Sequence, residues 1–314
     1  MHETRRAILD ALAEGPVTGP DLAERLDVSR AAVWNHVEAL REAGFDVVGT
    51  EAGYDLVSVP DYGAEAVEYG LEAPYEVEYH ESVPSTNALA RERATAGDPN
   101  VVILADEQTG GRGRRDREWN SPSGGVWLSI ALAPDLPPAR VPLLTLAAAV
   151  AVTEAVRDRG VEAAIKWPND VVVPGGGDRG GAKLAGILTE MEGESARVSW
   201  VVVGVGVNAN VEAASLPATA TSVQVEVGRI DRRTLVQDVL ERFADLSARP
   251  GDVLPAWCEH AVTLGQRVRI DAGGEVFEGD AVDVTATGAL VVSVDGENRT
   301  VHAGDCEHLR PATE

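Results

Sequence analysis

Residues 110–119 read Gly-Gly-Arg-Gly-Arg-Arg-Asp-Arg-Glu-Trp, a stretch that places four arginines among three glycines. The chain around it is strongly acidic, with 51 Asp and Glu residues against 27 Lys and Arg residues. Glycine lets a backbone approach a ligand closely, and arginine binds phosphate and carboxylate groups through paired hydrogen bonds. We therefore expect a loop that closes over an anionic ligand, with Trp119 stacking on it or sealing the site. A solvated surface loop of mixed charge is the alternative.

A second stretch, Lys166-Trp167-Pro168-Asn169-Asp170, contains one of only two lysines in the chain. A lysine ammonium can meet a phosphate, an asparagine can recognise a base or a ribose, and an aspartate can hold a magnesium ion. This combination predicts a nucleotide site with Mg²⁺ at Asp170. The alternative is that residues 168–170 form a simple turn.

The other lysine, Lys183, opens the apolar run 183–188, which follows a glycine-rich loop at residues 174–181. A charge at the start of a buried strand is costly unless an anion lies beside it. The position of Lys183 therefore favours a ligand contact over a surface lysine with a buried stem.

A fourth stretch, Gly204-Val205-Gly206-Val207-Asn208, ends a buried strand pattern. It is not a dinucleotide-binding sequence, because no helix with a third glycine follows it. The chain also lacks the Gly-x-x-x-x-Gly-Lys-Ser/Thr sequence of a P-loop. The two glycines could serve a ligand, or they could only allow close packing.

The middle of the chain alternates strand-like and helical patterns. Apolar runs at 101–105, 126–132 and 198–207 alternate with helical patterns at 86–96, 142–159 and 234–247. This alternation predicts a mixed α/β domain with a sheet covered by helices.

The last fifty residues change character. Short strand patterns at 266–271, 276–284, 289–294 and 298–303 are separated by glycine-containing turns. They predict a small β-barrel.

The first 60 residues carry three helical patterns and a strand pair. Ile8, Leu9 and Leu12 mark the first helix, and Thr18 and Ser29 are typical N-caps for the second and third. Residues 45–57 read as a hairpin. Helix, helix, turn, helix and hairpin is the order of the winged helix-turn-helix fold.

In that fold the helix after Ser29 enters the major groove, so Arg30, Asn35 and His36 are the predicted DNA contacts, with Trp34 available beside them. Charge argues against DNA binding, because residues 1–60 contain 5 Arg and 11 Asp or Glu residues, and phosphate neutralisation supplies most non-specific affinity. A domain used for dimerisation or packing is the open alternative.

The formal net charge is −24 at pH 7, and all basic residues except two lysines are arginine. Dense carboxylates stay hydrated in concentrated salt, so this composition predicts a halophilic protein, although a GC-rich genome also favours arginine. Two cysteines, Cys258 and Cys306, are too few for a disulfide framework or a zinc site. The most apolar stretch, 141–156, is interrupted by polar residues and too short for a bilayer, and no apolar signal core precedes it. We expect a cytoplasmic protein without a membrane partner.

These motifs together resemble the biotin protein ligase family, and the N-terminal part is similar to that of its bifunctional members, which also repress biotin-synthesis genes. The resemblance covers essentially the whole chain. It rests on Ser85-Thr86-Asn87, Gln108, Gly111-Arg112-Gly113-Arg114-Arg115, Lys166-Trp167-Pro168-Asn169-Asp170, Lys183-Leu184-Ala185-Gly186-Ile187-Leu188 and Gly204-Val205-Gly206-Val207-Asn208.

The fold that this resemblance implies is an α+β multidomain one. A winged helix-turn-helix domain would span residues 1–62, and a mixed α/β, class II synthetase-like catalytic domain that binds biotin and ATP would span 63–262. An SH3-like β-barrel would span 263–314, where it could contact the carrier protein or complete the nucleotide site.

The resemblance also implies a role for each motif residue. Lys183, Arg112 and Arg114 would be catalytic, with Lys183 as the family's essential lysine. The biotin-binding residues would be Ser85, Thr86, Asn87, Gln108, Gly111, Arg112, Gly113, Arg114 and Lys183. The nucleotide-binding residues would be Arg114, Trp119, Lys166, Asn169, Asp170 and Asn208, with Asp170 also holding Mg²⁺. One departure is Asp116, which stands where the family pattern has glycine and would stiffen the loop or place a repulsive charge near the phosphates.

The implied enzyme uses ATP and biotin as substrates with Mg²⁺. Its implied partners are a biotin carboxyl carrier domain, operator DNA and a second copy of itself. A lipoate protein ligase shares this adenylation chemistry, but the Gly-Arg-Gly-Arg and Lys-Trp-Pro-Asn-Asp stretches favour biotin. The other alternative is a transcription factor that only senses a ligand. Retention of both lysines in a lysine-poor chain argues against it, because binding alone could use arginine.

Overall fold

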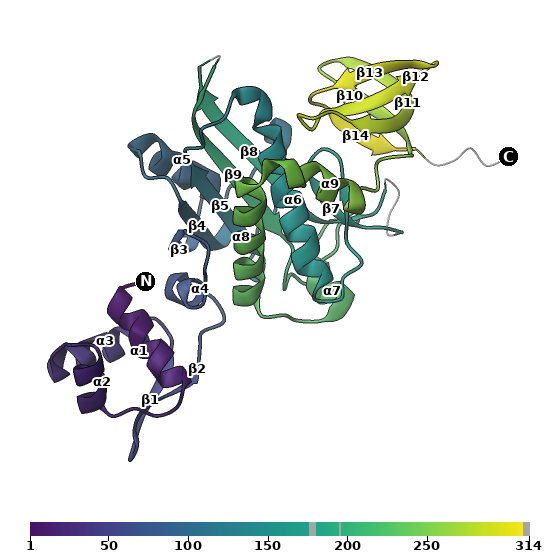
Figure 1. The fold of residues 1–314 in the computed structure, drawn as a ribbon. Coiled ribbons are helices and arrows are strands. Elements are labelled where there is room, and N and C mark those ends of the chain that lie inside the picture. Colours follow the sequence, from purple (N-terminus) through teal and green to yellow (C-terminus); the bar gives the residue numbers. More distant parts are fainter. Residues whose placement is uncertain (176–179, 195, 310–314) are drawn as a thin grey trace.

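The computed structural model describes residues 1–175, 180–194 and 196–309. Figure 1 shows a small helical part at the N-terminal end, a central sheet flanked by helices, and a β-rich part at the C-terminal end. The glycine-rich loop predicted at 174–181 lies partly outside the described residues, as do residues 310–314 of the predicted barrel domain. The predicted α+β architecture is confirmed.

The N-terminal part contains three helices and a hairpin in the predicted order. They are α1 (Glu3–Ala13), α2 (Gly19–Arg25), α3 (Arg30–Glu42), β1 (Asp46–Thr50) and β2 (Gly53–Ser58). The hydroxyl of Thr18 accepts a hydrogen bond from the backbone N–H of Asp21, and that of Ser29 accepts one from Ala32. These caps satisfy N–H groups that a helix start leaves free, so the predicted helix starts are confirmed.

A short helix, α4 (Ala64–Glu68), joins this part to the rest of the molecule. On one side Arg5 of α1 donates to Glu65 at 2.8 Å. On the other side Gln237 donates to the carbonyl oxygens of Val67 and Tyr69, both at 2.8 Å. Helix α4 is therefore fixed to the N-terminal and central parts at once.

The central sheet has seven strands in the order β3-β4-β5-β9-β8-β7-β6. Only β3 and β4 pair in parallel, and the other neighbours are antiparallel. The strands are β3 (Glu76–Val83), β4 (Val101–Gln108), β5 (Val126–Leu132), β6 (Ala164–Lys166), β7 (Asp170–Val173), β8 (Ala182–Gly193) and β9 (Val198–Val207).

Helices cover both faces of this sheet. Because side chains alternate between the faces of a strand, Ile103 packs toward Ala90 of α5 (Thr86–Ala96), whereas Val102 and Leu104 face the larger core. That core contains most of α6 (Pro142–Arg157) and is covered further by α8 (Arg232–Ala248) and α9 (Pro250–His260). The short helix α7 (Val223–Val227) lies in the connection between β9 and α8.

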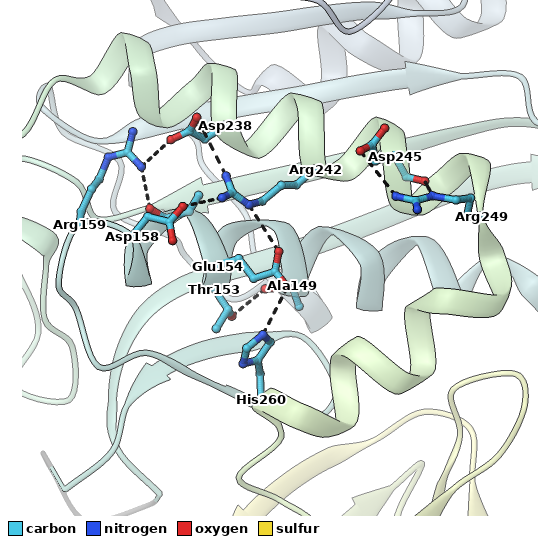
Figure 2. A network of polar contacts seen from close by, with 11 residues as sticks. Ala149, Thr153, Glu154, Asp158, Arg159, Asp238, Arg242, Asp245, Arg249 and His260 are labelled. Carbon is cyan, nitrogen blue, oxygen red and sulfur yellow. Dashed lines mark hydrogen bonds and ion pairs between the residues drawn. The ribbon is translucent and has the colours of Figure 1, made fainter.

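An ion-pair network ties α6, α8 and α9 together (Figure 2). Arg242 of α8 lies 3.4 Å from Glu154 and 2.5 Å from Asp158, both on or next to α6. Glu154 is also 3.4 Å from His260 at the end of α9. The network holds the helical layer together at its solvent side.

The segment Pro138–Arg157 meets the length and composition criteria for a membrane span, with 20 residues and a mean hydropathy of 1.6. This segment is longer than the apolar stretch at residues 141–156 that the sequence singled out. Within its most apolar window, however, 72% is buried inside the molecule. The core helix of a folded domain has the same composition.

The C-terminal part is a five-stranded antiparallel sheet in the order β13-β12-β11-β10-β14. Its strands are β10 (Arg267–Ala272), β11 (Glu275–Val284), β12 (Leu290–Val294), β13 (Glu297–Val301) and β14 (Asp305–His308). Four of them were predicted. Strand β14, which pairs with β10, was missed. The indole N–H of Trp167 donates to the carbonyl oxygen of Gly288 at 3.1 Å, which fastens this barrel to the central part.

Candidate active site

The four motifs meet in one cavity with a volume of about 520 Å³. It lies where β4 and β9 end and where β7, β8 and α5 begin. Among the predicted ligand contacts, Ser85, Thr86, Asn87, Gln108, Arg112, Gly113, Arg114, Trp119, Lys166, Asn169, Asp170, Lys183 and Asn208 line this cavity. Residues from six separate stretches of the chain are thus brought to one place.

Gly111 is the one predicted ligand contact that does not line the cavity. It is buried, and a Cβ atom there would lie 2.4 Å from the carbonyl oxygen of Trp119. Its backbone accepts a hydrogen bond from the Trp119 N–H at 3.0 Å. The glycine is therefore needed for a close crossing of the two ends of the loop.

The floor of the cavity is a set of amides and hydroxyls at the start of α5. The backbone N–H of Thr86 donates to Gln108 Oε1 at 2.8 Å, and Gln108 Nε2 donates to Ser121 Oγ at 2.9 Å. Ser129 Oγ lies 2.6 Å from Asn87 Oδ1 and 2.7 Å from Thr86 Oγ1. These groups can recognise a ligand that carries both hydrogen-bond donors and acceptors.

Two residues that form hydrogen bonds to this floor, Ser129 and Ser121, were not predicted. Ser129 is fully buried in the otherwise apolar strand β5, and a lone polar residue in such a strand was the signal that could have revealed it. Ser121 follows the arginine loop and carries no comparable signal in its neighbours.

The arginine loop (residues 110–119) reaches the C-terminal barrel. Arg114 donates to Asn169 Oδ1 at 3.0 Å and to the carbonyl oxygen of Gly304 at 2.7 Å. Arg115 pairs with Asp305 at 3.1 Å, and Arg117 contacts the same carboxylate. The barrel therefore helps to position the loop, and its residues 305–307 line the cavity.

The four arginines of the loop are not equivalent. Burial lowers the pKa of Arg114, but an arginine stays charged at physiological pH. The side chain of Arg112 has a single hydrogen bond within the described residues, to the carbonyl oxygen of Asp116 at 3.3 Å. Arg112 is thus the arginine of the loop that can most easily turn toward a ligand.

The backbone at Asp116 would suit the glycine that the resemblance implies there. Both Arg115 and Asp116 have φ of +55°, a left-handed conformation that glycine adopts without steric cost. Aspartate tolerates this region better than most residues, which explains how the loop keeps its path here.

Trp119 packs over two glycines of the sheet. A Cβ atom on Gly206 would lie 2.9 Å from Trp119 Nε1, and one on Gly186 would lie 3.5 Å from the ring. The ammonium of Lys183 lies 4.8 Å from the ring centroid, within the range of a cation–π interaction. The indole N–H is buried and has no hydrogen-bond partner in the part of the chain that the structure describes.

The Gly204-x-Gly206 pair allows close packing, which was one of its two interpretations. At Gly204 a Cβ atom would lie 2.1 Å from Asn87 Oδ1. Both glycines therefore make room for cavity side chains that come from other elements.

Both lysines, Lys166 and Lys183, line the cavity as well. Lys183 Nζ lies 2.7 Å from Asp170 Oδ1, so the anion that its position required is provided by the protein itself. The backbone of Lys183 pairs with Thr219 and Thr221 of the loop after β9. Asn208 is 3% exposed, and its Nδ2 donates to the carbonyl oxygen of Thr221 at 2.9 Å. Its side-chain nitrogen thus holds that loop.

The predicted DNA contacts lie on α3 as follows. Arg30, Trp34 and Asn35 are exposed, and Trp34 is 55% exposed. His36 instead stacks on His2, with ring centroids 4.9 Å apart. Burial, followed by the charges of His2 and Arg5, lowers the pKa of His36. The open face of α3 therefore presents three of the four residues considered.

Family models match three separate regions. The Biotin/lipoate A/B protein ligase family matches residues 79–208, an HTH domain matches residues 4–55, and the Biotin protein ligase C terminal domain matches residues 263–309.

Similar proteins span nearly the same length. A bifunctional ligase/repressor BirA of Bacillus subtilis is 34% identical, with 93% of each chain covered. A biotin–[acetyl-CoA-carboxylase] ligase of Mycobacterium tuberculosis is 34% identical over 72% of this chain and 86% of its own. A biotin protein ligase from Aquifex aeolicus, solved in complex with biotin and ATP, has the same fold with a TM-score of 0.61 at 23% identity. That match covers 75% of this chain and 99% of the other.

Proposed function

The chain belongs to the biotin protein ligase family, and from that premise we propose that its cavity activates biotin with ATP and transfers it to a lysine of a biotin carboxyl carrier domain. The supporting observation is the convergence of a polar floor, the arginine loop and the Lys183–Asp170 pair in one cavity. The floor suits a polar ring, and the cationic groups suit a carboxylate and a phosphate. The protein is a ligase with an N-terminal repressor-type helix-turn-helix domain.

In the first step an oxygen of the biotin carboxylate attacks the α-phosphorus of ATP. The bond from that phosphorus to the pyrophosphate oxygen breaks, and biotinyl-5′-AMP forms. No proton has to move, so the side chains act by positioning and by neutralising charge. Lys183, Arg112 and Arg114 supply the positive charge, and Arg114 is already held by Asn169 and Gly304.

In the second step the neutral amine of the carrier lysine attacks the acyl carbon. AMP leaves with the electron pair of the C–O bond, and the nitrogen releases a proton. The adenylate must be kept from water until the carrier docks. The arginine loop and Trp119 serve this purpose, because the loop spans from the cavity to the barrel.

Asp170 fits the role of a Mg²⁺ ligand. No group of three or more His, Cys, Asp or Glu side chains that could hold a metal occurs within residues 1–175, 180–194 and 196–309. Mg²⁺ is usually held by one or two carboxylates together with the phosphates of the substrate, and Asp170 is a carboxylate that lines the cavity. Asp170 would hold the ion, which supplies positive charge to the phosphate oxygens.

The N-terminal part acts as a biotin-responsive repressor that contacts operator DNA through the exposed face of α3. Arg30 and Asn35 contact bases or phosphates there. His36 supports the helix from the side of α1, where it lies against His2. Operator binding would use a homodimer, because paired half-sites match a protein two-fold axis. The net charge of −24 supports a halophilic protein whose activity requires concentrated salt. We also propose that the protein is cytoplasmic.

The test is transfer of labelled biotin to a biotin carrier domain, with ATP and Mg²⁺, over a salt titration and beside a lipoate carrier. We expect transfer to the biotin carrier alone. Lys183→Ala should reduce it by about 10²- to 10³-fold, the usual cost of removing one electrostatic stabiliser of a transition state. Arg197→Ala, which removes only an exposed pair with Asp135, is the control.

Two results would overturn the proposal. Biotin binding without transfer at any salt concentration would favour a ligand sensor. Labelling of the lipoate carrier with lipoate would favour a lipoate ligase.

A further inference from the structure

The side-chain amide of Asn87 lies across strand β9 at Gly204. Its nitrogen is on the β8 side, 2.8 Å from Glu190 Oε2 and 3.4 Å from the carbonyl oxygen of Leu188. Its oxygen is on the β5 side, 2.6 Å from Ser129 Oγ. In the sheet Gly204 pairs with Leu188 on one side and with Ser129 on the other, so the amide spans three strands.

The orientation of this amide follows from its neighbours. A carboxylate and a backbone carbonyl can only accept hydrogen bonds, so the end of the amide beside Glu190 and Leu188 must be the NH₂ group. The hydroxyl of Ser129 can donate to the oxygen at the other end. Without Glu190, only the longer contact to Leu188 would distinguish the two ends.

The chain of hydrogen bonds that begins at Glu190 and Asn87 continues along the cavity floor. Thr86 Oγ1 lies 2.7 Å from Ser129 Oγ and 3.1 Å from Gln108 Oε1. Gln108 in turn donates through Nε2 to Ser121 Oγ, which donates to the carbonyl oxygen of Trp119 at 3.2 Å. The network therefore runs from a carboxylate on β8 to the end of the arginine loop.

Glu190 is not among the residues that line the cavity. Its carboxylate is partly exposed and lies 3.6 Å from Arg91 of α5, which holds it beside Asn87. A group that fixes a cavity side chain without reaching the ligand is a positioning residue.

We propose that Glu190 sets the orientation of the Asn87 amide and through it the pattern of hydrogen-bond donors and acceptors that the cavity floor presents to the ring of the ligand. In this orientation Asn87 Oδ1 is an acceptor, and Gln108 Nε2 keeps a second N–H as a donor. The identity of the ligand rests on the proposed function. The hydrogen-bond network is observed in the structure and does not depend on that function.

The test is a reciprocal exchange in the full-length protein. In the wild type the Asn87 nitrogen lies 2.8 Å from the Glu190 carboxylate. Asn87→Asp puts a second carboxylate in that place. The repulsion between the two carboxylates should lower the thermal unfolding midpoint and raise the KM for biotin. In the double variant Asn87→Asp with Glu190→Gln, the amide NH₂ of residue 190 can donate to the carboxylate of residue 87, which reverses the wild-type direction. Ser129 can still donate to residue 87. We expect this double variant to regain most of both losses.

Glu190→Ala should raise the KM for biotin by about tenfold or more, as expected for the loss of a hydrogen bond to a charged group. The KM for ATP should change by less than about threefold, because the network lies at the ring end of the cavity. Glu192→Ala is the matched control, since Glu192 is an exposed glutamate two residues along the same strand. A merely structural role for Glu190 would move both KM values together.

The outcomes separate the two proposals. A double variant no better than Asn87→Asp in midpoint and in KM for biotin would overturn the role of Glu190. If the wild type transfers no biotin, the proposed function fails, and the midpoints of the same variants still decide whether Glu190 orients Asn87.

Discussion

Gly204 and Gly206 form a matched pair for testing how the cavity is built. Both lie on β9 and line the cavity, and each can be changed to alanine. A Cβ atom at position 204 would lie 2.1 Å from Asn87 Oδ1, whereas one at position 206 would lie 2.9 Å from Trp119 Nε1. The same substitution therefore meets a fixed amide at one position and a loop side chain at the other.

The expected cost at position 204 follows from the contacts of Asn87. To reach an ordinary separation of about 3.5 Å the amide would have to withdraw by more than about 1 Å. Its hydrogen bonds to Ser129, 2.6 Å, and Glu190, 2.8 Å, would then break. A neutral hydrogen bond contributes about 1 kcal/mol and one to a charged group about 2 kcal/mol. Gly204→Ala should therefore lower the free energy of unfolding by about 3 kcal/mol.

Gly206→Ala should cost less than about 1 kcal/mol, because the Trp119 ring has no hydrogen bond to lose within the described residues and can move with its loop. Its effect should fall on retention of the adenylate, which we propose that the Trp119 ring covers. Gly49→Ala on β1 is the control, since a Cβ there has no atom within 4 Å.

Thermal unfolding and the KM for biotin measure both effects. At about 2–4 °C per kcal/mol for a domain of this size, Gly204→Ala should lower the midpoint by about 6–12 °C and raise the KM for biotin. Gly206→Ala should stay within about 4 °C of the wild type but release the adenylate faster. Equal midpoints for the two variants, or a Gly204→Ala variant as stable as Gly49→Ala, would refute the reasoning.

Three further predictions concern the loop and the barrel. Asp305→Asn should release Arg117 and leave Arg115 held by Asp271 alone. This should speed cleavage of the loop by trypsin at Arg117, and an unchanged cleavage rate would show that the pairs with Asp305 do not hold the loop. Burial lowers the pKa of His308 from 6.5 to about 4, so between these values the unfolded chain binds a proton that the folded chain does not, and stability falls as the pH drops. The midpoints at about pH 4.5 and pH 7.5 should therefore differ less in His308→Gln than in the wild type, and an equal difference would contradict this. Asp116 has a left-handed φ of +55°, which costs a non-glycine residue about 1 kcal/mol. Asp116→Gly should therefore raise the free energy of unfolding and leave biotin transfer intact. A thermal unfolding midpoint several degrees below that of the wild type would count against this.

Sequence patterns correctly predicted those structural features that depend on residues close together in the chain, such as helix starts. The N-caps Thr18 and Ser29 start their helices where the hydroxyls suggested, because a cap acts within three residues of itself. The sequence also indicated which residues lie close together, because every predicted ligand contact except Gly111 lines one cavity. Their roles toward a ligand remain predictions.

The partners of those residues were not predictable in the same way. Asp305 lies 190 residues beyond Arg115 in the chain, and Glu190 lies 103 residues beyond Asn87. Nothing near either acid distinguishes it from the many other carboxylates of this chain. His36 shows the same limit, since helical periodicity indicates its side of α3 but does not reveal that His2 stacks on it.

The loop contacts with the barrel differ in how they should respond to salt. The pairs of Arg115 and Arg117 with Asp305 are at least partly exposed, and concentrated salt screens such pairs strongly. Arg114 is more buried and donates to two neutral oxygens, those of Asn169 and Gly304, which salt does not neutralise. If the acidic surface reflects life in concentrated salt, two contacts still join loop and barrel there, from Arg114 to the carbonyl oxygen of Gly304 and from Arg115 to the carbonyl oxygen of Asp271 at 3.2 Å. Arg117, which lines the cavity, then remains available for the phosphates of the nucleotide.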